Sequence, residues 1–340
     1  MGVSTAARSI DWRDGAVVAV DQRALPGEYR LMRLTTVDEI IVAITTLAVR
    51  GAPAIGAAGA FGVVLAALAH GDEAAVRADA ERLAAARPTA VNLRWGVDRA
   101  LRRLPEGADA VLDEALALLT EDEATTRAAA RRAAAWVLAA CPRRPLRVLT
   151  HCNTGRLATV AWGTALGAIR ELAAMGQLGE VLAGETRPLL QGARLTVWEL
   201  AEAGIPHRLC VDSAGPAAIA AGLVDCVLVG ADRITAGGDV ANKIGTYSLA
   251  LAAARHGIPF VVVATESTLD PAIADGRDIV IEERAAEEVT GYAGLDVAPA
   301  GTRAYNPAFD VTPRELITAI VLEDTVMEST VLESTVMETS

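Results

Sequence analysis

The chain has 340 residues, 52% of them hydrophobic, and a formal net charge of -12. This length and hydrophobic content indicate a folded globular protein with room for two cored domains, and they exclude a disordered chain. The acidic charge disfavours nucleic acid and anionic membranes as general partners, so a small anionic ligand would need a local pocket of arginine, lysine and backbone N–H groups.

The cysteines and the N-terminus favour a cytoplasmic protein. Cys141, Cys152, Cys210 and Cys226 show no CxxC spacing, which disfavours a zinc ribbon or a redox pair. Cys210 and Cys226 lie in apolar, strand-like runs and are interpreted as core residues. No apolar run of signal-peptide length opens the chain, and the apolar run at 54–69 is short and glycine-rich for a membrane span. We therefore expect reduced thiols in the cytoplasm.

Residues 1–142 predict a mainly helical domain with a small β-sheet. Residues 11–34 read as two or three short strands. Thr36 followed by Glu39 has the spacing of a capping box, which predicts a helix to about Leu47. Three glycines at intervals of three residues then favour close helix packing: Gly56, Gly59 and Gly62. Further helices are expected at 73–86, 93–104 and 108–140.

The cluster Pro142–Pro145 ends the long helix and marks the expected domain boundary. Beyond it strands and helices alternate, which predicts an α/β fold with a parallel sheet covered on both faces. Strands are expected at 146–150, 180–183, 208–211, 226–229, 260–264 and 279–281. Helices are expected at 157–175, 189–203, 215–221 and 242–256. Residues 324–340 repeat a five-residue unit with neither helical nor strand period, so they are interpreted as a low-complexity tail without chemistry.

The stretch RVLTHCNTG, residues 147–155, is the centre of the predicted site. It reads as a strand that runs into a polar loop just before a helix, and ligands of parallel α/β sheets bind at such strand ends. Cys152 lies in this loop, whereas His151 is interpreted as a structural histidine. A helix dipole would lower the pKa of the Cys152 thiol and an apolar wall would raise it, and the sequence leaves both effects open.

Other strand ends carry polar loops of the same kind. Asp232 follows an apolar strand, and Asn242 with Lys243 is expected to open the next helix. Gln191 lies in a third such loop. Because the carboxyl ends of parallel strands share one edge of a sheet, these loops predict a single crevice. A capping role is the alternative for Asp232.

In the helical region Arg50 is a candidate for an anion clamp, and Arg87 is a weaker candidate for a functional role. Arg50 precedes a Gly-Ala-Pro turn at the start of the glycine-spaced helix, where backbone N–H groups would add to a guanidinium. Arg87 stands before Pro88, which ends a helix. The sequence also permits a helix-capping role for Arg50 and a solvated position for Arg87. The sequence contains no GxGxxG after a strand, no Walker A motif, no HExxH and no GxSxG. These absences disfavour a dinucleotide dehydrogenase and a P-loop NTPase.

Several long stretches, in this order, resemble the S-methyl-5-thioribose-1-phosphate isomerase family, aldose–ketose isomerases of methionine salvage. They are VRGAPAIG, RPTAVNLRW, LTHCNTG, GETRPLLQGARLTVWEL and VGADRITAGGDVANKIGTYSLA. The resemblance ends with NPAFDVTPRELITAI and leaves the tail outside. It implies an N-terminal helical domain with a small sheet over 1–142, a Rossmann-like catalytic domain over 143–323, and a homodimer.

The resemblance also implies roles for single residues. Cys152 and Asp232 would be the catalytic pair. Substrate contacts would come from Arg50, Gly51, Ala52, Arg87, Gln191, Asn242 and Lys243. The implied ligand is a small sugar phosphate, with no metal, no organic cofactor, no nucleic acid and no membrane involved.

The implied reaction sets requirements that these residues can meet. A furanose whose C1 oxygen carries phosphate cannot open to a free aldehyde, so opening needs an acid at the ring oxygen, and a buried Asp232 fits that role. Hydrogen must also move from C2 to C1, either as a proton shuttled by Cys152 or as a hydride. The alternatives are 5-deoxyribose-1-phosphate or ribose-1,5-bisphosphate isomerases, and the non-catalytic regulatory subunits of a translation-initiation nucleotide exchange factor, which share the fold.

Overall fold

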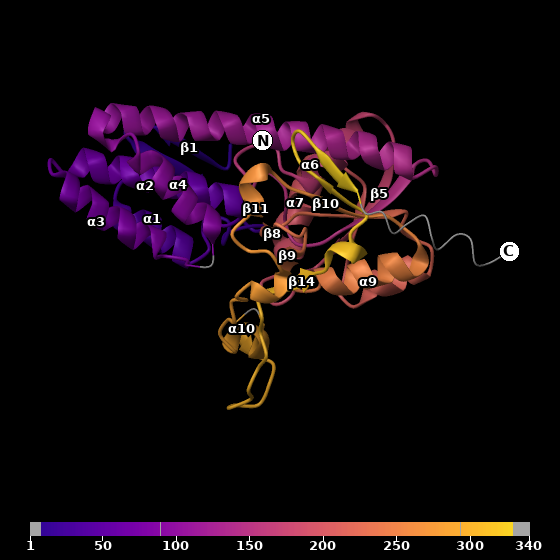
Figure 1. Cartoon of the computed structure of the whole chain (residues 1–340). Coiled ribbons are helices and arrows are strands. Elements are labelled where there is room, and N and C mark those ends of the chain that lie inside the picture. Colours follow the sequence, from indigo (N-terminus) through magenta and orange to yellow (C-terminus); the bar gives the residue numbers. More distant parts are fainter. Residues whose placement is uncertain (1–7, 89, 293, 329–340) are drawn as a thin grey trace.

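The computed structural model describes residues 8–88, 90–292 and 294–328 of the chain. It is a mixed α/β structure with a helical N-terminal region and a large mixed sheet (Figure 1). The chain opens with the antiparallel strands β1 (Ile10–Arg13), β2 (Ala16–Val20) and β3 (Leu31–Leu34). The helices α1 (Val37–Thr45), α2 (Ala52–Ala69), α3 (Glu73–Ala84), α4 (Val91–Leu101) and α5 (Ala108–Ala140) follow. The capping box of Thr36 and Glu39 is confirmed at the start of α1.

Helix α2 lies at the centre of the first core, and its glycines let its neighbours approach, as predicted. A Cβ on Gly62 would lie 2.7 Å from the Leu83 side chain, and one on Gly56 would lie 2.9 Å from the Asn92 carbonyl oxygen. By length and hydropathy α2 could cross a membrane, but 72% of it is buried inside the protein. Its apolar character therefore serves the core.

Helix α5 runs along both parts of the molecule (Figure 1). Its first half, including Val111 and Leu119, packs in the core around α2. Its second half, including Ala130 and Val137, packs against the large sheet. The helix ends at Ala140, before the Pro142–Pro145 cluster as expected. The single helix is thus shared by two hydrophobic cores.

The large sheet has the strand order β16-β15-β10-β7-β4-β5-β6. The strands are β4 (Leu146–Thr150), β5 (Leu178–Gly184), β6 (His207–Cys210), β7 (Cys226–Val229), β10 (Phe260–Val263), β15 (Ala319–Val321) and β16 (Val326–Glu328). All neighbours pair in parallel except β16, which is antiparallel to β15. The order reverses between β4 and β7, and such a switch point opens a crevice at the carboxyl ends of the strands.

Alternate residues of the strands enter different cores, which confirms a sheet covered on both faces. Val148 and Leu228 pack with α5 and α6 (Ala165–Ala174). Leu149 and Val227 pack on the other face with α8 (Ala214–Ala220) and α9 (Thr246–His256). This division follows from the two-residue period of strands, and it explains why β7 and β10 are apolar throughout.

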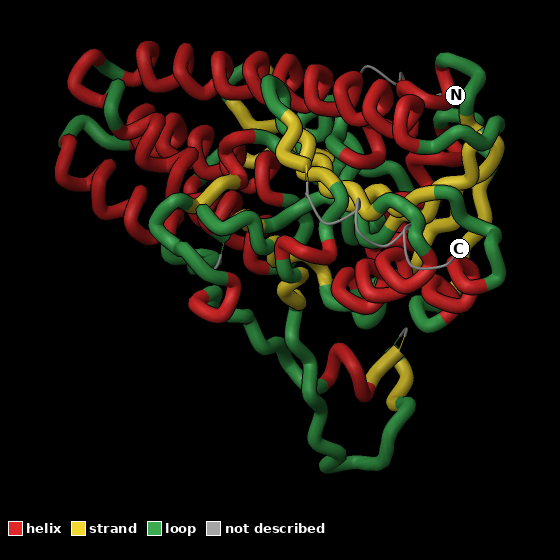
Figure 2. The backbone as a smooth tube through the Cα atoms, turned by 45° about the vertical axis from the view of Figure 1, so that its right-hand side comes forward, coloured by secondary structure: helices red, strands yellow, loops and turns green. Residues whose placement is uncertain are grey.

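A smaller sheet continues from the switch point, in the order β11-β8-β9-β14. Its strands are β8 (Arg233–Thr235), β9 (Val240–Lys243), β11 (Leu269–Asp270) and β14 (Phe309–Thr312). Before β14 the chain leaves the body as a protruding arm, seen in Figures 1 and 2. The arm carries α10 (Glu287–Thr290) and the hairpin β12 (Gly291–Tyr292) and β13 (Leu295–Asp296).

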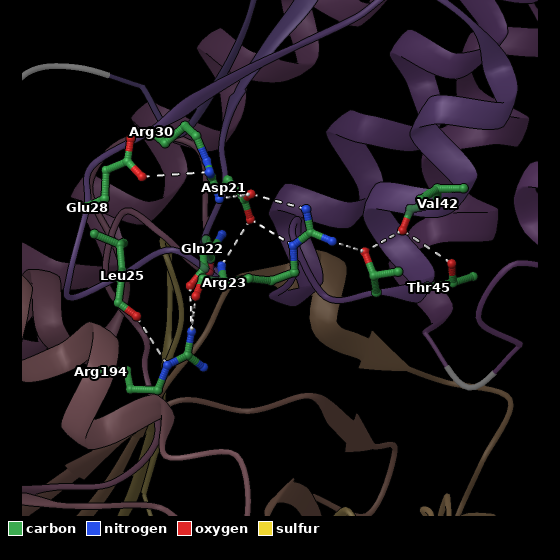
Figure 3. Close-up of polar contacts among 10 residues, drawn as sticks. Asp21, Gln22, Arg23, Leu25, Glu28, Arg30, Val42, Thr45 and Arg194 are labelled. Carbon is green, nitrogen blue, oxygen red and sulfur yellow. Dashed lines mark hydrogen bonds and ion pairs between the residues drawn. The ribbon is translucent and has the colours of Figure 1, made fainter. Parts of the chain in front are cut away.

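The segment after β5 begins with a π-helix, Gly192–Thr196, and continues as α7 (Val197–Glu202). Arg194 of the π-helix ties it to the N-terminal region (Figure 3). Its Nη2 donates to the Gln22 carbonyl oxygen at 2.7 Å, and its Nε donates to the Leu25 carbonyl oxygen at 3.2 Å. Burial lowers the pKa of Arg194, which faces carbonyl dipoles.

The helix predicted to start at 157 begins only at Ala165. The chain instead folds back in a loop closed by a bridge between Gly155 and Gly163. Thr154 caps the helix across this loop, because its hydroxyl accepts the Leu166 N–H at 3.1 Å. The prediction of Cys152 directly before a helix N-terminus is therefore wrong.

Three further predictions are corrected. Asn242 and Lys243 lie in β9 and do not open a helix, since α9 begins at Thr246. Residues 279–281 form no strand in the described chain. The tail is not wholly without structure, because its residues 326–328 form β16 at the edge of the large sheet. The rest of the repeat, 329–340, lies outside the described residues.

Candidate active site

A cavity of about 850 Å³, partly open to solvent, lies at the carboxyl ends of β4 and β7, where the strand order reverses. It is bounded by the N-terminal helices on one side and by the two sheets on the other. All nine residues predicted for the site line it. They are Arg50, Gly51, Ala52, Arg87, Cys152, Gln191, Asp232, Asn242 and Lys243. The fold thus brings together stretches from both halves of the chain.

Cys152 follows β4 and has a backbone φ of 62°, a conformation that residues other than glycine rarely adopt. Two threonines hold this backbone: the Cys152 N–H donates to Thr186 Oγ1 at 3.0 Å, and Thr196 Oγ1 donates to the Cys152 carbonyl oxygen at 2.5 Å. Burial raises the pKa of the Cys152 thiol, although Arg50 and Lys243 oppose the shift. The apolar surroundings therefore outweigh the nearby cations, and the thiol is protonated at neutral pH.

Asp232 comes two residues after Gly230, at the end of β7, and its N–H donates to the Ala241 carbonyl oxygen at 2.9 Å. Burial raises the pKa of the Asp232 carboxyl, while Lys243, Arg50 and Arg87 lower it by a smaller amount. A carboxyl whose protonated form is favoured in this way is suited to donate a proton. Asp232 and Cys152 line the same cavity.

Lys243 is a largely buried cation beside this pair. Its Nζ donates to the Ala308 carbonyl oxygen at 2.8 Å and lies 4.4 Å from the centre of the Phe309 ring. Burial lowers the pKa of Lys243, with Cys152 and Asp232 opposing the shift. The cation is thus held in the cavity by a carbonyl and an aromatic face.

The end of the cavity next to α2 is suited to an anion. Gly51 precedes α2 with a φ of 92°, and a Cβ there would lie 2.3 Å from the Ala158 carbonyl oxygen, so only glycine fits. The first turn of α2 offers the positive end of the helix dipole and the Ala52 N–H, since Pro53 has no N–H and the Ala54 N–H donates to the Ala158 carbonyl oxygen at 3.3 Å. Arg50 adds a guanidinium, and Arg87 adds another that pairs with Glu282 at 3.4 Å.

Two amides complete the lining. Gln191 is 7% exposed, and its Oε1 is buried without a hydrogen-bond partner among the described residues. Asn242 is 3% exposed, and its Nδ2 donates to Thr246 Oγ1 at 3.0 Å. An orphaned acceptor such as Gln191 Oε1 is costly, and a ligand hydroxyl would satisfy it.

Sequence reasoning missed several lining residues. Arg284 lies at the base of the arm, where it pairs with Glu288 at 2.6 Å and Glu282 at 2.9 Å. The neighbours of Arg284 in the sequence are alanines and charged residues, which do not indicate a site. Asn153 belongs to the predicted motif and contacts Arg50. Thr265 follows β10 at the same edge of the sheet. Within the described ranges, no three His, Cys, Asp or Glu side chains gather as a metal site would require.

A recess of about 560 Å³, partly open to solvent, adjoins the cavity and shares Arg87, Asp232 and Phe309 with it. A second arginine, Arg233, also lines this recess. Aliphatic side chains form much of its remaining wall: Ile55, Val91, Ile279, Val280 and Ile281. The residues once expected to form a strand thus contribute a wall of this recess. A ligand in the cavity can extend an uncharged group into it.

Comparisons with known proteins show the family to which the chain belongs. The sequence model of the initiation factor 2 subunit family matches residues 48–329. A relative from Nocardia farcinica, named a probable bifunctional methylthioribose-1-phosphate isomerase/methylthioribulose-1-phosphate dehydratase, is 69% identical over 323 residues. The match covers 94% of this chain but only 58% of that relative, so the chain spans less than two thirds of its length.

Two further relatives match over nearly their full length. A 5-deoxyribose 1-phosphate isomerase from Moorella thermoacetica is 49% identical over 331 residues, 93% of each chain. The crystal structure of 5-methylthioribose 1-phosphate isomerase from Pyrococcus horikoshii is 38% identical and superimposes with a TM-score of 0.85 over 95% of this chain and 92% of that one. The chain therefore belongs to the initiation factor 2 subunit family, and within it to the branch that contains the methylthioribose-1-phosphate isomerases.

Proposed function

We propose that the chain isomerises S-methyl-5-thio-α-D-ribose 1-phosphate to S-methyl-5-thio-D-ribulose 1-phosphate in methionine salvage. The observation that carries this proposal is the single cavity that joins Cys152 and Asp232 to cations and to the N-terminus of α2. The names of the related isomerases supply the substrate class. The same names favour a sugar-phosphate enzyme over a non-catalytic regulatory subunit.

In the proposed reaction Asp232 donates its proton to the ring oxygen as the bond from that oxygen to C1 breaks. The raised pKa of Asp232 keeps this proton available near neutrality. Arg50, Arg87 and the N-terminal end of α2 would hold the phosphate and thereby orient C1 and C2 beside Cys152. Gln191 and Asn242 would bind sugar hydroxyls.

Two routes for hydrogen transfer follow from the opened sugar. In one, hydride passes from C2 to C1 while the C2 hydroxyl becomes the ketone and returns its proton to the Asp232 carboxylate left by ring opening. In the other, C2 loses a proton to a base and C1 regains one through an enediol-type intermediate, and the C2 hydroxyl again gives up its proton as the ketone forms. A Cys152 thiol that is protonated at rest must release its own proton before it can act as that base, so its burial favours the hydride route. Reaction in tritiated water separates the routes, because only the proton route incorporates tritium at C1.

The substituent at C5 would occupy the recess that adjoins the cavity. The aliphatic side chains of its wall suit a methylthio or methyl group. The Moorella relative, named for 5-deoxyribose 1-phosphate, makes that sugar the second candidate substrate.

The decisive experiment offers the purified chain the 1-phosphates of 5-methylthioribose and 5-deoxyribose, and ribose 1,5-bisphosphate. We expect the highest kcat/KM for the methylthio sugar and the lowest for the bisphosphate. Ketose formation without any added protein distinguishes an enzyme from a regulatory subunit. A failure to convert any of the three sugars would refute the proposal.

The same proposal includes the wider organisation of the protein. The order of the parallel strands, with its reversal between β4 and β7, supports a Rossmann-like domain over 143–323 after a helical domain over 1–142. The proposal includes a cytoplasmic homodimer that binds neither nucleic acid nor membrane, and the acidic charge supports the absence of those two partners. Sedimentation of the purified chain would measure its oligomeric state.

A further inference from the structure

A buried carboxylate lies behind the loop that carries Cys152. Glu199, in α7, is 4% exposed and does not line the cavity. Its Oε1 accepts the Asn153 Nδ2–H at 2.8 Å, and its Oε2 accepts the Arg156 backbone N–H at 2.9 Å. Since a buried carboxylate needs such donors, the glutamate and the loop hold each other in place.

Glu199 is the nearer of two acceptors that orient the Asn153 side chain, because the Asn153 Nδ2–H donates to Glu199 Oε1 at 2.8 Å and to Thr196 Oγ1 at 3.3 Å. An amide that donates through Nδ2 to a carboxylate must turn its oxygen the other way. The Asn153 Oδ1 accepts from Arg50 Nη1 at 3.3 Å, and the Asn153 carbonyl oxygen accepts from Arg50 Nη2 at 3.1 Å. A chain of contacts therefore runs from Glu199 through Asn153 to the guanidinium in the cavity.

Gly155 makes room for this carboxylate. A Cβ at Gly155 would lie 2.3 Å from Glu199 Oε2 and 2.5 Å from its Cδ, inside van der Waals contact. The glycine that ends the HCNTG motif and the glutamate in α7 thus fit each other, although neither reaches the ligand.

We propose that Glu199 is a positioning residue for the phosphate clamp, acting on Arg50 through Asn153. This inference rests on the proposed function only in requiring that the cavity bind a phosphate group. In Glu199→Gln one carboxylate oxygen becomes an NH2 group that faces an N–H donor. Asn153 then keeps the longer contact with Thr196 but loses its charged acceptor, so the Asn153 Oδ1 that accepts from Arg50 is held less firmly.

The test compares Glu199→Gln with Glu202→Gln. Glu202 lies in the same helix and pairs with Arg156 Nη2 at 2.8 Å, but no bond joins it to Asn153. Titration calorimetry with inorganic phosphate should show Kd raised about tenfold by Glu199→Gln and less than about twofold by Glu202→Gln. With the sugar phosphate, KM should rise while kcat changes little, because the clamp binds substrate and transition state alike.

A double-mutant cycle with Arg50→Lys identifies the path. If Glu199 acts through Arg50, adding Glu199→Gln to Arg50→Lys weakens phosphate binding no further. The inference would be overturned if the losses of the two substitutions were additive. It would also be overturned if the two glutamate variants lost phosphate affinity equally, or if Glu199→Gln left phosphate binding unchanged.

A second variant is needed if Glu199→Gln no longer unfolds in a cooperative thermal transition. In that case Asn153→Ala should show the same tenfold loss of phosphate affinity, and unchanged phosphate binding would contradict the inference. Phosphate binding without isomerisation by the wild-type chain would refute the proposed function and leave this inference standing.

Discussion

At the scale of single residues, burial controls the chemistry of the site. The sequence placed Cys152 and Asp232 at one sheet edge, and both line the cavity, but it could not determine the protonation of the thiol. The expected helix N-terminus beside Cys152 is replaced by a loop, so desolvation dominates and the pKa of the thiol rises. The positions could be predicted from strand ends, whereas the protonation states depend on packing by distant segments.

Asp232→Asn should bind substrate but lose turnover, because the amide cannot protonate the ring oxygen. We expect kcat to fall about 10²- to 10⁴-fold with a small change in KM. Asp270→Asn is the control, since Asp270 pairs with the neighbouring Arg233 at 3.6 Å and does not line the cavity. A variant at position 232 that keeps a tenth of the wild-type kcat would remove Asp232 from the acid role.

The pH dependence of kcat should show the same group. Because Asp232 acts in its protonated form and burial raises its pKa, kcat should fall as pH increases through that raised pKa. The residual rate of Asp232→Asn should lack this alkaline decline. Stopped assays between about pH 5 and pH 9 measure both profiles. An identical decline in the variant would assign it to another group.

At the scale of elements, long and regular patterns could be predicted and short pairings could not. The helices of the first half and the core strands of the large sheet follow from their apolar periods. The sequence pattern predicts a helix from residue 242, whereas residues 240–243 form β9 of the hairpin with β8. Gly237 and Gly238 at its turn were the available signal. Residues 279–281 have the composition of a strand but pair with no strand among the described residues.

Asp310 links β14 to the start of α9. Its Oδ2 accepts the N–H groups of Gly245 at 2.7 Å and Tyr247 at 3.1 Å, and its Oδ1 is buried without a partner in the described chain. Burial raises the pKa of Asp310 to about 6 from the usual 3.8. The folded state thus keeps a proton that the unfolded chain releases, so the free energy of unfolding falls as pH rises from about 4 to about 6.

Asp310→Asn should remove this pH-dependent loss, because the amide oxygen can still accept both N–H groups and nothing titrates. Relative to wild type, the variant should gain up to about 3 kcal/mol in the free energy of unfolding between pH 4 and pH 7. Urea unfolding at the two pH values measures the difference. A constant difference would show that Asp310 does not titrate in this range.

At the scale of the whole molecule, the repeat at the end of the chain contributes an edge of the main sheet. Its low-complexity composition hid β16, since a three-residue strand is specified by its partner β15 and not by its own pattern. Trp136 Nε1 donates to Glu328 Oε1 at 2.5 Å, and Arg314 Nη2 donates to the Met327 carbonyl oxygen at 3.1 Å. These contacts join β16 to α5 and to the approach to β15.

A chain that ends after Glu323 should therefore be less stable than one that ends after Glu328. The first lacks β16 and exposes the edge of β15, so its Tm should fall by about 5 °C and its tendency to aggregate should rise. The second keeps β16, so its Tm should equal that of the full chain. Calorimetry and light scattering compare the three proteins. Equal melting of the two shortened chains would contradict a stabilising role for β16.

The continuity of α5 limits how a ligand can reach the cavity. One side of the cavity comes from the α2 core and the other from the sheets, and the two cores share this 33-residue helix. A hinge motion that separated the two cores would require α5 to bend and its backbone hydrogen bonds to break between Leu119 and Ala129. Substrate admission and product release consequently belong to the loops and side chains at the rim.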